Sequence, residues 1–241
     1  NVDGLSMPDG FNTAFVFDNN TVQNNGRDGA SIYGDLFNKN SILISNNTFS
    51  GNTNIGLRTS SARIWGNTLE NNKINFGVWG PLGFDYTNPL SDSDDNVFGS
   101  SSYGKGIELK DRRLQDTLQV GLPAGLSGGA YLFSNYNSSE AVIQGDTLVI
   151  EPGVIVKGGY DGAHRFRVSG LLIADANGSD QIVFTSFRDD TFGGLTTPVA
   201  DTLSPKPGNW GGLYLTDNNA RNTEESILRN LKIDYAQNGI Y

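Results

Sequence analysis

Oxygen-bearing side chains in one acidic stretch have the spacing of calcium ligands. Asp92, Asp94 and Asn96 place oxygen atoms at every second position, as at the start of an EF-type loop. Val97 stands where such a loop needs glycine, and Tyr103 stands where it needs a bidentate glutamate. Two interpretations therefore stay open for this stretch, a structural calcium site and a polar linker.

A second pair of carboxylates, Asp189 and Asp190, follows Arg188. This group could perform acid–base chemistry, hold calcium or order a loop. Adjacent residues of a strand point to opposite faces, so the two carboxylates do not have to converge on one substrate atom. The pattern favours a solvated turn over a calcium-binding or loop-ordering role, and it favours either of these over catalysis.

Three tryptophans could provide platforms that stack against sugar rings. In a chain built from short coils, the same side chains could equally fill the core or a corner. Both interpretations apply to Trp65, Trp79 and Trp210.

An asparagine-rich pattern, which would position these groups, recurs three times near the start of the chain. It reads FDNNTVQNN from Phe17, ISNNTFSGN from Ile44 and IWGNTLENN from Ile64. Each copy carries an apolar residue, an asparagine three positions on, a threonine and a second apolar residue. A repeat of roughly 20 to 27 residues with short β-prone runs is typical of a solenoid, because each coil buries its apolar face against its neighbours.

The recurring asparagine has a structural explanation. Side-chain amides stacked at an internal turn could hydrogen-bond to one another and to main-chain groups that would otherwise be buried unpaired. We therefore expect a structural ladder formed by Asn20, Asn47 and Asn67.

The pattern divides the chain into three parts. Residues 1–80 hold the asparagine-rich coils, which we interpret as the C-terminal part of a solenoid unit. Residues 81–129 are rich in Gly, Ser, Asp and Pro and predict an irregular connector with one strand, GIELK. Residues 130–241 begin a second run of short strands, interrupted by a loop at 188–212. The sequence thus predicts an all-β parallel β-helix, a β-solenoid with two coil runs and a connector between them.

Charge and composition limit the partners. The chain of 241 residues has a formal net charge of −9 and no cysteine. Nucleic acid and anionic membranes are poor partners, because binding to either normally relies on clustered lysine and arginine. No apolar run is long enough to insert into a membrane, and disulfides are excluded. The chain opens without a signal peptide, so we expect a processed product or an excerpt.

Over most of its length the chain resembles the right-handed parallel β-helix repeat proteins of the pectin-lyase-like superfamily. The asparagine-rich coils carry one half of the resemblance. The segment TLVIEPGVIVKGG, with SFRDD and PGNWGGLYL after it, is similar to the opening module of large bacterial surface and secreted β-helix proteins. Members often carry an acidic, glycine-rich insertion after RDD that looks like a calcium loop. This chain keeps Gly193 and Gly194 and continues LTTPVADTLSP instead.

The resemblance also implies a test for enzymes, because enzymes of this fold cleave acidic polysaccharides. Lyases of this kind gather carboxylates around calcium beside an Arg or Lys, and hydrolases place two or three Asp residues on adjacent coils. Neither constellation is visible in the sequence. We therefore expect a non-enzymatic extracellular or cell-surface protein, a repeating unit of a filament, sheath or adhesin stalk. The alternative is a carbohydrate-active enzyme or carbohydrate-binding module that acts on acidic polysaccharide.

The two ends of the chain suggest the partner. The last residues, LRNLKIDYAQNGIY, are an incomplete copy of the coil pattern, with Leu228, Asn230 and Ile233 at matching positions. The first residues read as the middle of a coil, and the end joined to the start would run on as NGIYNVDG. A terminal coil of a solenoid has an unpaired strand edge, which can pair with another strand. We therefore predict that copies stack head to tail through their terminal coils.

Overall fold

The chain folds into parallel strands joined by turns. A computed structural model describes residues 3–11, 14–34, 42–60, 62–79, 96–110, 112–113, 118–121, 128–133, 140–159, 164–178, 180–197, 201–216 and 225–241. Every pairing between named strands in this part of the chain is parallel. Within the same ranges, no helix is long and apolar enough to cross a membrane.

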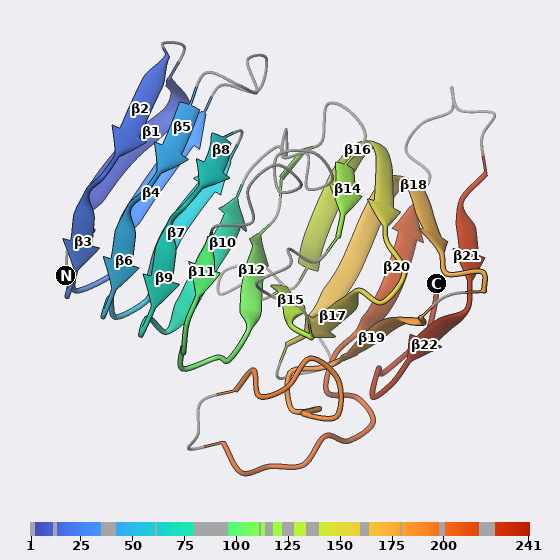
Figure 1. Ribbon diagram of the computed structural model, residues 1–241. Helices are drawn as coiled ribbons and strands as arrows, with labels where there is room; N and C mark the ends of the chain where they lie inside the picture. Colours follow the sequence, from blue (N-terminus) through green and yellow to red (C-terminus); the bar gives the residue numbers. More distant parts are fainter. Residues whose placement is uncertain are drawn as a thin grey trace.

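One sheet, sheet A, runs through the whole stack of coils (Figure 1). Each coil contributes one strand to it, so the coils pile up along a single axis. Among the described residues its nine strands are, in order, β1 (Leu5–Phe11), β4 (Ala30–Gly34), β7 (Ile55–Ser60), β10 (Ile74–Trp79), β12 (Gly106–Lys110), β15 (Ala130–Phe133), β17 (Ile155–Gly158), β19 (Ile182–Ser186) and β22 (Leu231–Ile233).

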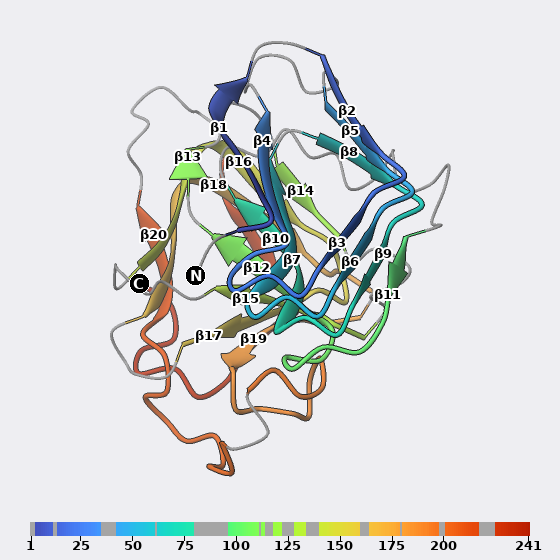
Figure 2. The same ribbon diagram turned by 90° about the vertical axis from the view of Figure 1, so that its left-hand side faces the viewer.

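Two smaller sheets complete the N-terminal coils, and the three sheets form three sides of the stack in Figure 2. Sheet B consists of β2 (Phe15–Asp18), β5 (Ile42–Ser45) and β8 (Ala62–Trp65). Sheet C consists of β3 (Thr21–Gln23), β6 (Thr48–Ser50), β9 (Thr68–Glu70) and β11 (Val97–Phe98). The first coils therefore pass through sheets A, B and C in turn, with a tight corner between sheets B and C and a second corner between sheets C and A.

The C-terminal coils pair sheet A with one other sheet, sheet D. Its two 11-residue strands are β16 (Glu140–Ile150) and β18 (Arg165–Asp175). The register between them shifts between Gln144 and Thr147, and the two halves of β18 pair separately with β20 (Gly212–Thr216) and β21 (Ile227–Arg229). The two halves of β16 likewise pair with β13 (Arg112–Arg113) and β14 (Leu118–Val120). One irregular strand thus takes the place that two short strands hold in the N-terminal coils.

Sheet A passes without interruption through the segment predicted as a connector. The predicted strand GIELK is β12, which pairs with β10 on one side and β15 on the other. Strands β11, β13 and β14 lie in the same segment. The rest of it, residues 81–95, 111, 114–117 and 122–127, lies outside the described residues. The two predicted coil runs therefore share one sheet, in which every inner strand has a neighbour on both edges.

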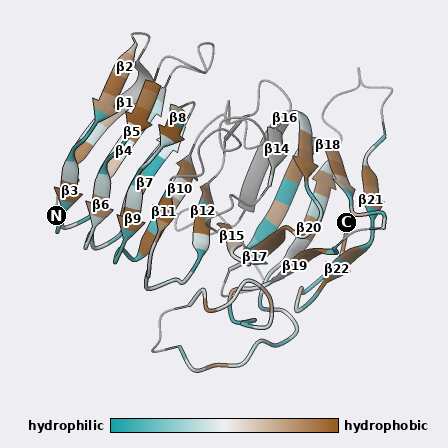
Figure 3. Cartoon of the chain, in the orientation of Figure 1, coloured by the Kyte–Doolittle hydropathy of each residue, from teal (hydrophilic) through white to brown (hydrophobic). Residues whose placement is uncertain are grey.

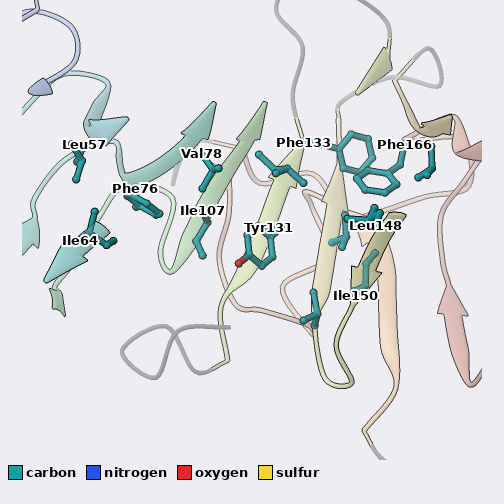
Figure 4. Packing of buried hydrophobic residues seen from close by; sticks show 14 of the residues in the cluster. Leu57, Ile64, Phe76, Val78, Ile107, Tyr131, Phe133, Leu148, Ile150 and Phe166 are labelled. Carbon is teal, nitrogen blue, oxygen red and sulfur yellow. The ribbon is translucent and has the colours of Figure 1, made fainter. Parts of the chain in front are cut away.

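The core follows from this register. Because parallel coils stack without offset, the inward side chains of sheet A form one apolar column through the main hydrophobic cluster. Figure 3 shows the hydrophobic residues distributed over the strands, and Figure 4 shows part of the column from Leu57 to Tyr131. The column comprises Leu5, Ala30, Leu57, Phe76, Ile107, Tyr131, Val156, Phe184 and Ile233.

Candidate functional site

A column of asparagines fills the corner between sheets B and C. The main-chain N–H and the side-chain Nδ2 of Asn47 both donate to Oδ1 of Asn67, each at 3.0 Å. Asn20 donates to Asn47 in the same way, at 2.8 and 3.1 Å. The structure therefore brings Asn20, Asn47 and Asn67 into one ladder of hydrogen bonds, in which each rung donates toward the next coil.

Each inner rung also bonds to the coil behind it. Nδ2 of Asn47 donates to the main-chain oxygen of Phe17 at 2.7 Å, and Nδ2 of Asn67 donates to that of Ile44 at 2.9 Å. Asn47 and Asn67 are buried, with exposed fractions of 1% and 0%. Since a buried polar group without a partner costs about 1–3 kcal/mol, the amide fits this corner because it satisfies both neighbouring coils.

Asn96, which the sequence indicates as a possible calcium ligand, is the fourth rung of this ladder. Its Oδ1 accepts hydrogen bonds from the main-chain N–H and Nδ2 of Asn67, both at 3.0 Å. Its Nδ2 donates to the main-chain oxygen of Ile64 at 3.3 Å. The other two predicted ligands, Asp92 and Asp94, lie outside the described residues.

A second ladder, which the sequence analysis missed, fills the corner between sheets C and A. Asn25 donates through its main-chain N–H and Nδ2 to Oδ1 of Asn52, at 3.1 and 2.9 Å. Asn52 donates to Oδ1 of Asn72 in the same way, both bonds at 2.9 Å. The signal was present in the sequence, because each of these residues follows a rung of the first ladder by five positions.

Two glycines, Gly29 just before β4 and Gly56 in β7, leave room for the second ladder. A Cβ atom on Gly29 would lie 2.6 Å from Nδ2 of Asn52, and one on Gly56 would lie 2.5 Å from Nδ2 of Asn72. These distances are shorter than any side-chain contact allows. Glycine is therefore required at these two positions, both by the asparagine of the next coil and by the main-chain oxygen beside it, which would lie 2.4 Å from a Cβ on Gly29 and 2.8 Å from one on Gly56.

The residue before each rung from Asn20 to Asn72 has a left-handed backbone conformation, which turns the corner between two strands. Only glycine, and to a lesser degree asparagine, adopts this conformation at low cost. Six corners of the N-terminal coils have such a residue, with φ between 53° and 64°: Asn19, Asn24, Asn46, Gly51, Gly66 and Asn71.

The outer face of sheet A is also covered, and it buries charged side chains. Arg58 bonds through Nη2 to Oε2 of Glu108 at 3.1 Å and through Nη1 to the carboxylate of Asp28. Burial opposes the charge of Arg58, but Glu108 and Asp28 hold the pKa of the guanidinium above its ordinary value. This triad links three coils of the stack, because the residues lie in or beside β4, β7 and β12.

Asp189 and Asp190 lie at the start of the predicted loop and do not converge. The carboxylate of Asp189 is buried, where it accepts hydrogen bonds from Oγ1 of Thr185 at 2.7 Å and from the N–H of Thr191 at 3.1 Å. Asp190 is exposed. No group of three or more His, Asp or Glu residues in the described ranges could hold a metal ion.

The main-chain oxygen of Asp189 accepts a hydrogen bond from Nζ of Lys157 at 2.8 Å. The lysine is fully buried, and this burial lowers its pKa to about 8, against the opposing effect of Asp190 and Asp189. Sequence reasoning gave no reason to single out Lys157, because it occupies an outward position of a short strand.

The three tryptophans have different environments. Trp65 is 40% exposed at the end of β8. Trp210 is fully buried, with its ring 5.8 Å from that of Phe133 and its Nε1 donating to the main-chain oxygen of Asp234 at 2.7 Å. The side chain of Trp79 lies outside the described part of the chain. Trp210 is thus a core residue, and Trp65 alone of the two described side chains is open to a ligand.

The two ends of the stack leave apolar side chains half open. Of the partly exposed apolar residues that pack against the main cluster in the described ranges, all but Phe98 belong to the first coil or to residues 212–241 at the other end. At the start they are Leu5, Phe15, Phe17 and Val22, and at the end they are Leu215, Leu228, Leu231, Ile233 and Ala236. The main-chain groups on the outer edges of β1, β2 and β3 also have no strand beside them in the described fold.

Comparison with known proteins identifies the coils. Residues 3–119 match the family model described as a right handed beta helix region. No curated protein and no solved structure matches the chain. The matched family includes both enzymes and non-enzymes, so the match alone assigns no reaction.

Proposed function

Because the chain is a right-handed parallel β-helix, we propose that it is a non-enzymatic structural β-solenoid. It serves outside the cell or at its surface as the repeating unit of a filament, sheath or adhesin stalk. The half-open apolar faces at the two ends of the stack carry the proposal. An unpaired strand edge beside apolar side chains is a template for a further strand, and the occupant we propose is a second copy of this chain.

The asparagine ladders give this contact a direction. Each rung that is followed by another rung donates toward it, and the side-chain oxygens of Asn20 and Asn25 accept no hydrogen bond from the described residues. Two first coils placed face to face would bring acceptor against acceptor. The polarity of the ladders therefore favours head-to-tail over head-to-head stacking.

Electron microscopy and sedimentation velocity over a range of concentrations test the proposal. Stacking predicts particles that lengthen with concentration and have an axial repeat of about 43 Å, because nine strands of sheet A rise about 4.8 Å each. The substitution Phe17→Ser on the first-coil face should weaken the association. Val97→Ser, at a 55% exposed position in the inner part of the stack, should leave it unchanged.

Three results would count against the proposal. Compact single particles at every concentration would exclude stacking between copies. Cleavage of an acidic polysaccharide such as polygalacturonate by the purified chain would favour the enzyme alternative. Binding of such a polymer that is lost on Trp65→Ala would favour the carbohydrate-binding alternative.

A further inference from the structure

We propose that the ammonium group of Lys157 is the resident cation of the loop from Phe187 to Thr197, in a cage of oxygen atoms that would suit a metal ion. Its Nζ donates to the main-chain oxygens of Asp189 and Gly194, at 2.8 and 2.7 Å, and to Oγ1 of Thr196, at 3.1 Å. All three donors of the ammonium are thus used, and all three acceptors belong to one short loop.

The cage has the chemistry of a site for a hard cation. Carbonyl and hydroxyl oxygens are ligands that calcium and similar ions take in proteins. The lysine side chain is fully buried, and so is that of Thr196, whose Oγ1 also donates to the main-chain oxygen of Phe187 at 2.8 Å. Because Lys157 is part of β17, its ammonium group occupies the cage permanently, and the loop does not need a free ion there.

Asp189, the buried one of the two acidic residues in the loop, supports the cage through its main chain and not through its carboxylate. Asp189 binds Nζ through its main-chain oxygen, while its carboxylate holds Thr185 and Thr191. At the other side of the loop, Nε of Arg188 bonds to Oδ2 of Asp201 at 3.0 Å. Positively charged side chains of the chain itself therefore hold the loop in two places, Lys157 at the cage and Arg188 at Asp201.

The closed loop acts as a strap across neighbouring coils. Gly193, with φ of 64°, lies so close to β15 that a Cβ atom on it would be 2.7 Å from Cβ of Ala130. The loop also contacts Gly104, which precedes β12. A Cβ atom on Gly104 would lie 2.3 Å from the main-chain oxygen of Leu195. With Lys157 on β17, the strap spans three coils and covers the second apolar cluster, which comprises Ile55, Ile74, Tyr103, Ala130, Leu132 and Phe187.

Limited proteolysis with mass spectrometry tests this assignment on the whole chain. For the unmodified chain, the rate of cleavage within residues 187–209 should be the same in 5 mM calcium and in excess EDTA. The variant Lys157→Met, which keeps the length of the side chain without its charge, should be cleaved there at least tenfold faster. Lys206→Ala removes an exposed lysine of the same segment and should match the unmodified chain.

Chemical rescue separates a cation site from simple packing. In Lys157→Ala, the emptied cage should accept ethylammonium, which should slow cleavage at least threefold while leaving Lys157→Met unaffected. Faster cleavage of the unmodified chain in EDTA would overturn the assignment, because the loop would then depend on a metal. Protection of Lys157→Met equal to that of the unmodified chain, or the absence of rescue in Lys157→Ala, would also overturn it.

Discussion

The N-terminal and C-terminal coils solve the same structural problem in two ways. A coil must turn corners, and each corner takes main-chain groups out of the sheets. In the N-terminal coils, left-handed residues make tight corners and asparagine ladders satisfy the groups inside them. In the C-terminal coils, β16 and β18 continue through the position of one corner, so most of their main-chain groups stay paired within sheet D.

The difference extends to the core. Both regions bury aliphatic side chains, and the N-terminal coils also bury single rings such as Phe49 and Phe76. In the C-terminal coils, four rings contact one another in the interior, with Phe133 beside Phe166 at 5.2 Å (Figure 4). The N-terminal coils thus depend on polar ladders at their corners, whereas the C-terminal coils contain a cluster of aromatic rings. We expect the two regions to respond to different substitutions.

The largest loss should follow from emptying the aromatic core. Trp210→Ala removes a fully buried ring that stacks on Phe184 at 6.5 Å, and should lower the free energy of unfolding by about 4 kcal/mol. Trp65→Ala, at a 40% exposed position of the N-terminal coils, should change it by less than about 1 kcal/mol. Denaturant unfolding measures both. Equal losses would mean that Trp210 is not a core residue in solution.

Breaking the ladder should give the next largest loss. Asn67→Ala leaves the two donors of Asn47 and the main-chain oxygen of Ile44 without partners, and should destabilise the chain by about 2–3 kcal/mol. Asn230→Ala, at an exposed left-handed residue of the C-terminal coils, should cost about 1 kcal/mol. The same unfolding measurement compares them. A loss at Asn230 as large as that at Asn67 would refute a special role for the ladder.

The sequence predicted the features that repeat. The spacing of Asn20, Asn47 and Asn67 gave the parallel solenoid and the residues of the first ladder, because a residue that recurs at one coil position meets a copy of itself. Asn96 was attributed to a calcium pattern instead, since the passage from Asn67 is 29 residues long and hides the periodicity. The second ladder follows the same logic and could have been found.

Features that depend on distant loops could not be predicted. Lys157 and Arg58 occupy outward positions of sheet A, which in an isolated strand would face water. They are buried because segments far along the chain fold over that face, as the loop near Asp189 does. No local pattern indicates such a cover. A similar reason applies to Trp210, whose neighbours Phe133 and Phe184 come from other coils.

A methyl group should be costly at a glycine that faces a ladder and harmless at a glycine with open space around it. Gly56→Ala places Cβ 2.5 Å from Nδ2 of Asn72 and 2.8 Å from the main-chain oxygen of Asn75, and should cost about 2 kcal/mol. Gly239→Ala, with no atom within 4 Å of the added Cβ, should be neutral to within about 0.5 kcal/mol. Thermal unfolding of the two variants checks this. If Gly56→Ala left the stability unchanged, the asparagines of the second ladder could move aside without loss of free energy.

The smallest effect isolates the conformational cost of one corner. Asn46 has φ of 53° and an exposed side chain, and Gly66 holds the equivalent place in the next coil. Asn46→Gly should therefore change the free energy of unfolding by less than about 0.5 kcal/mol. Asn46→Val should lower it by about 1–2 kcal/mol, because a β-branched residue is disfavoured in this conformation.

The difference between these two variants, measured by denaturant unfolding, reports the backbone rather than lost contacts. Among the described residues, Nδ2 of Asn46 donates only to the exposed carboxylate of Asp18, at 2.9 Å, and both substitutions remove this bond equally. If valine and glycine proved equal, the corner would not keep its left-handed residue in solution. The asparagines at the other corners would then be explained by their hydrogen bonds alone, and the contrast with the continuous strands of sheet D would rest on the ladders.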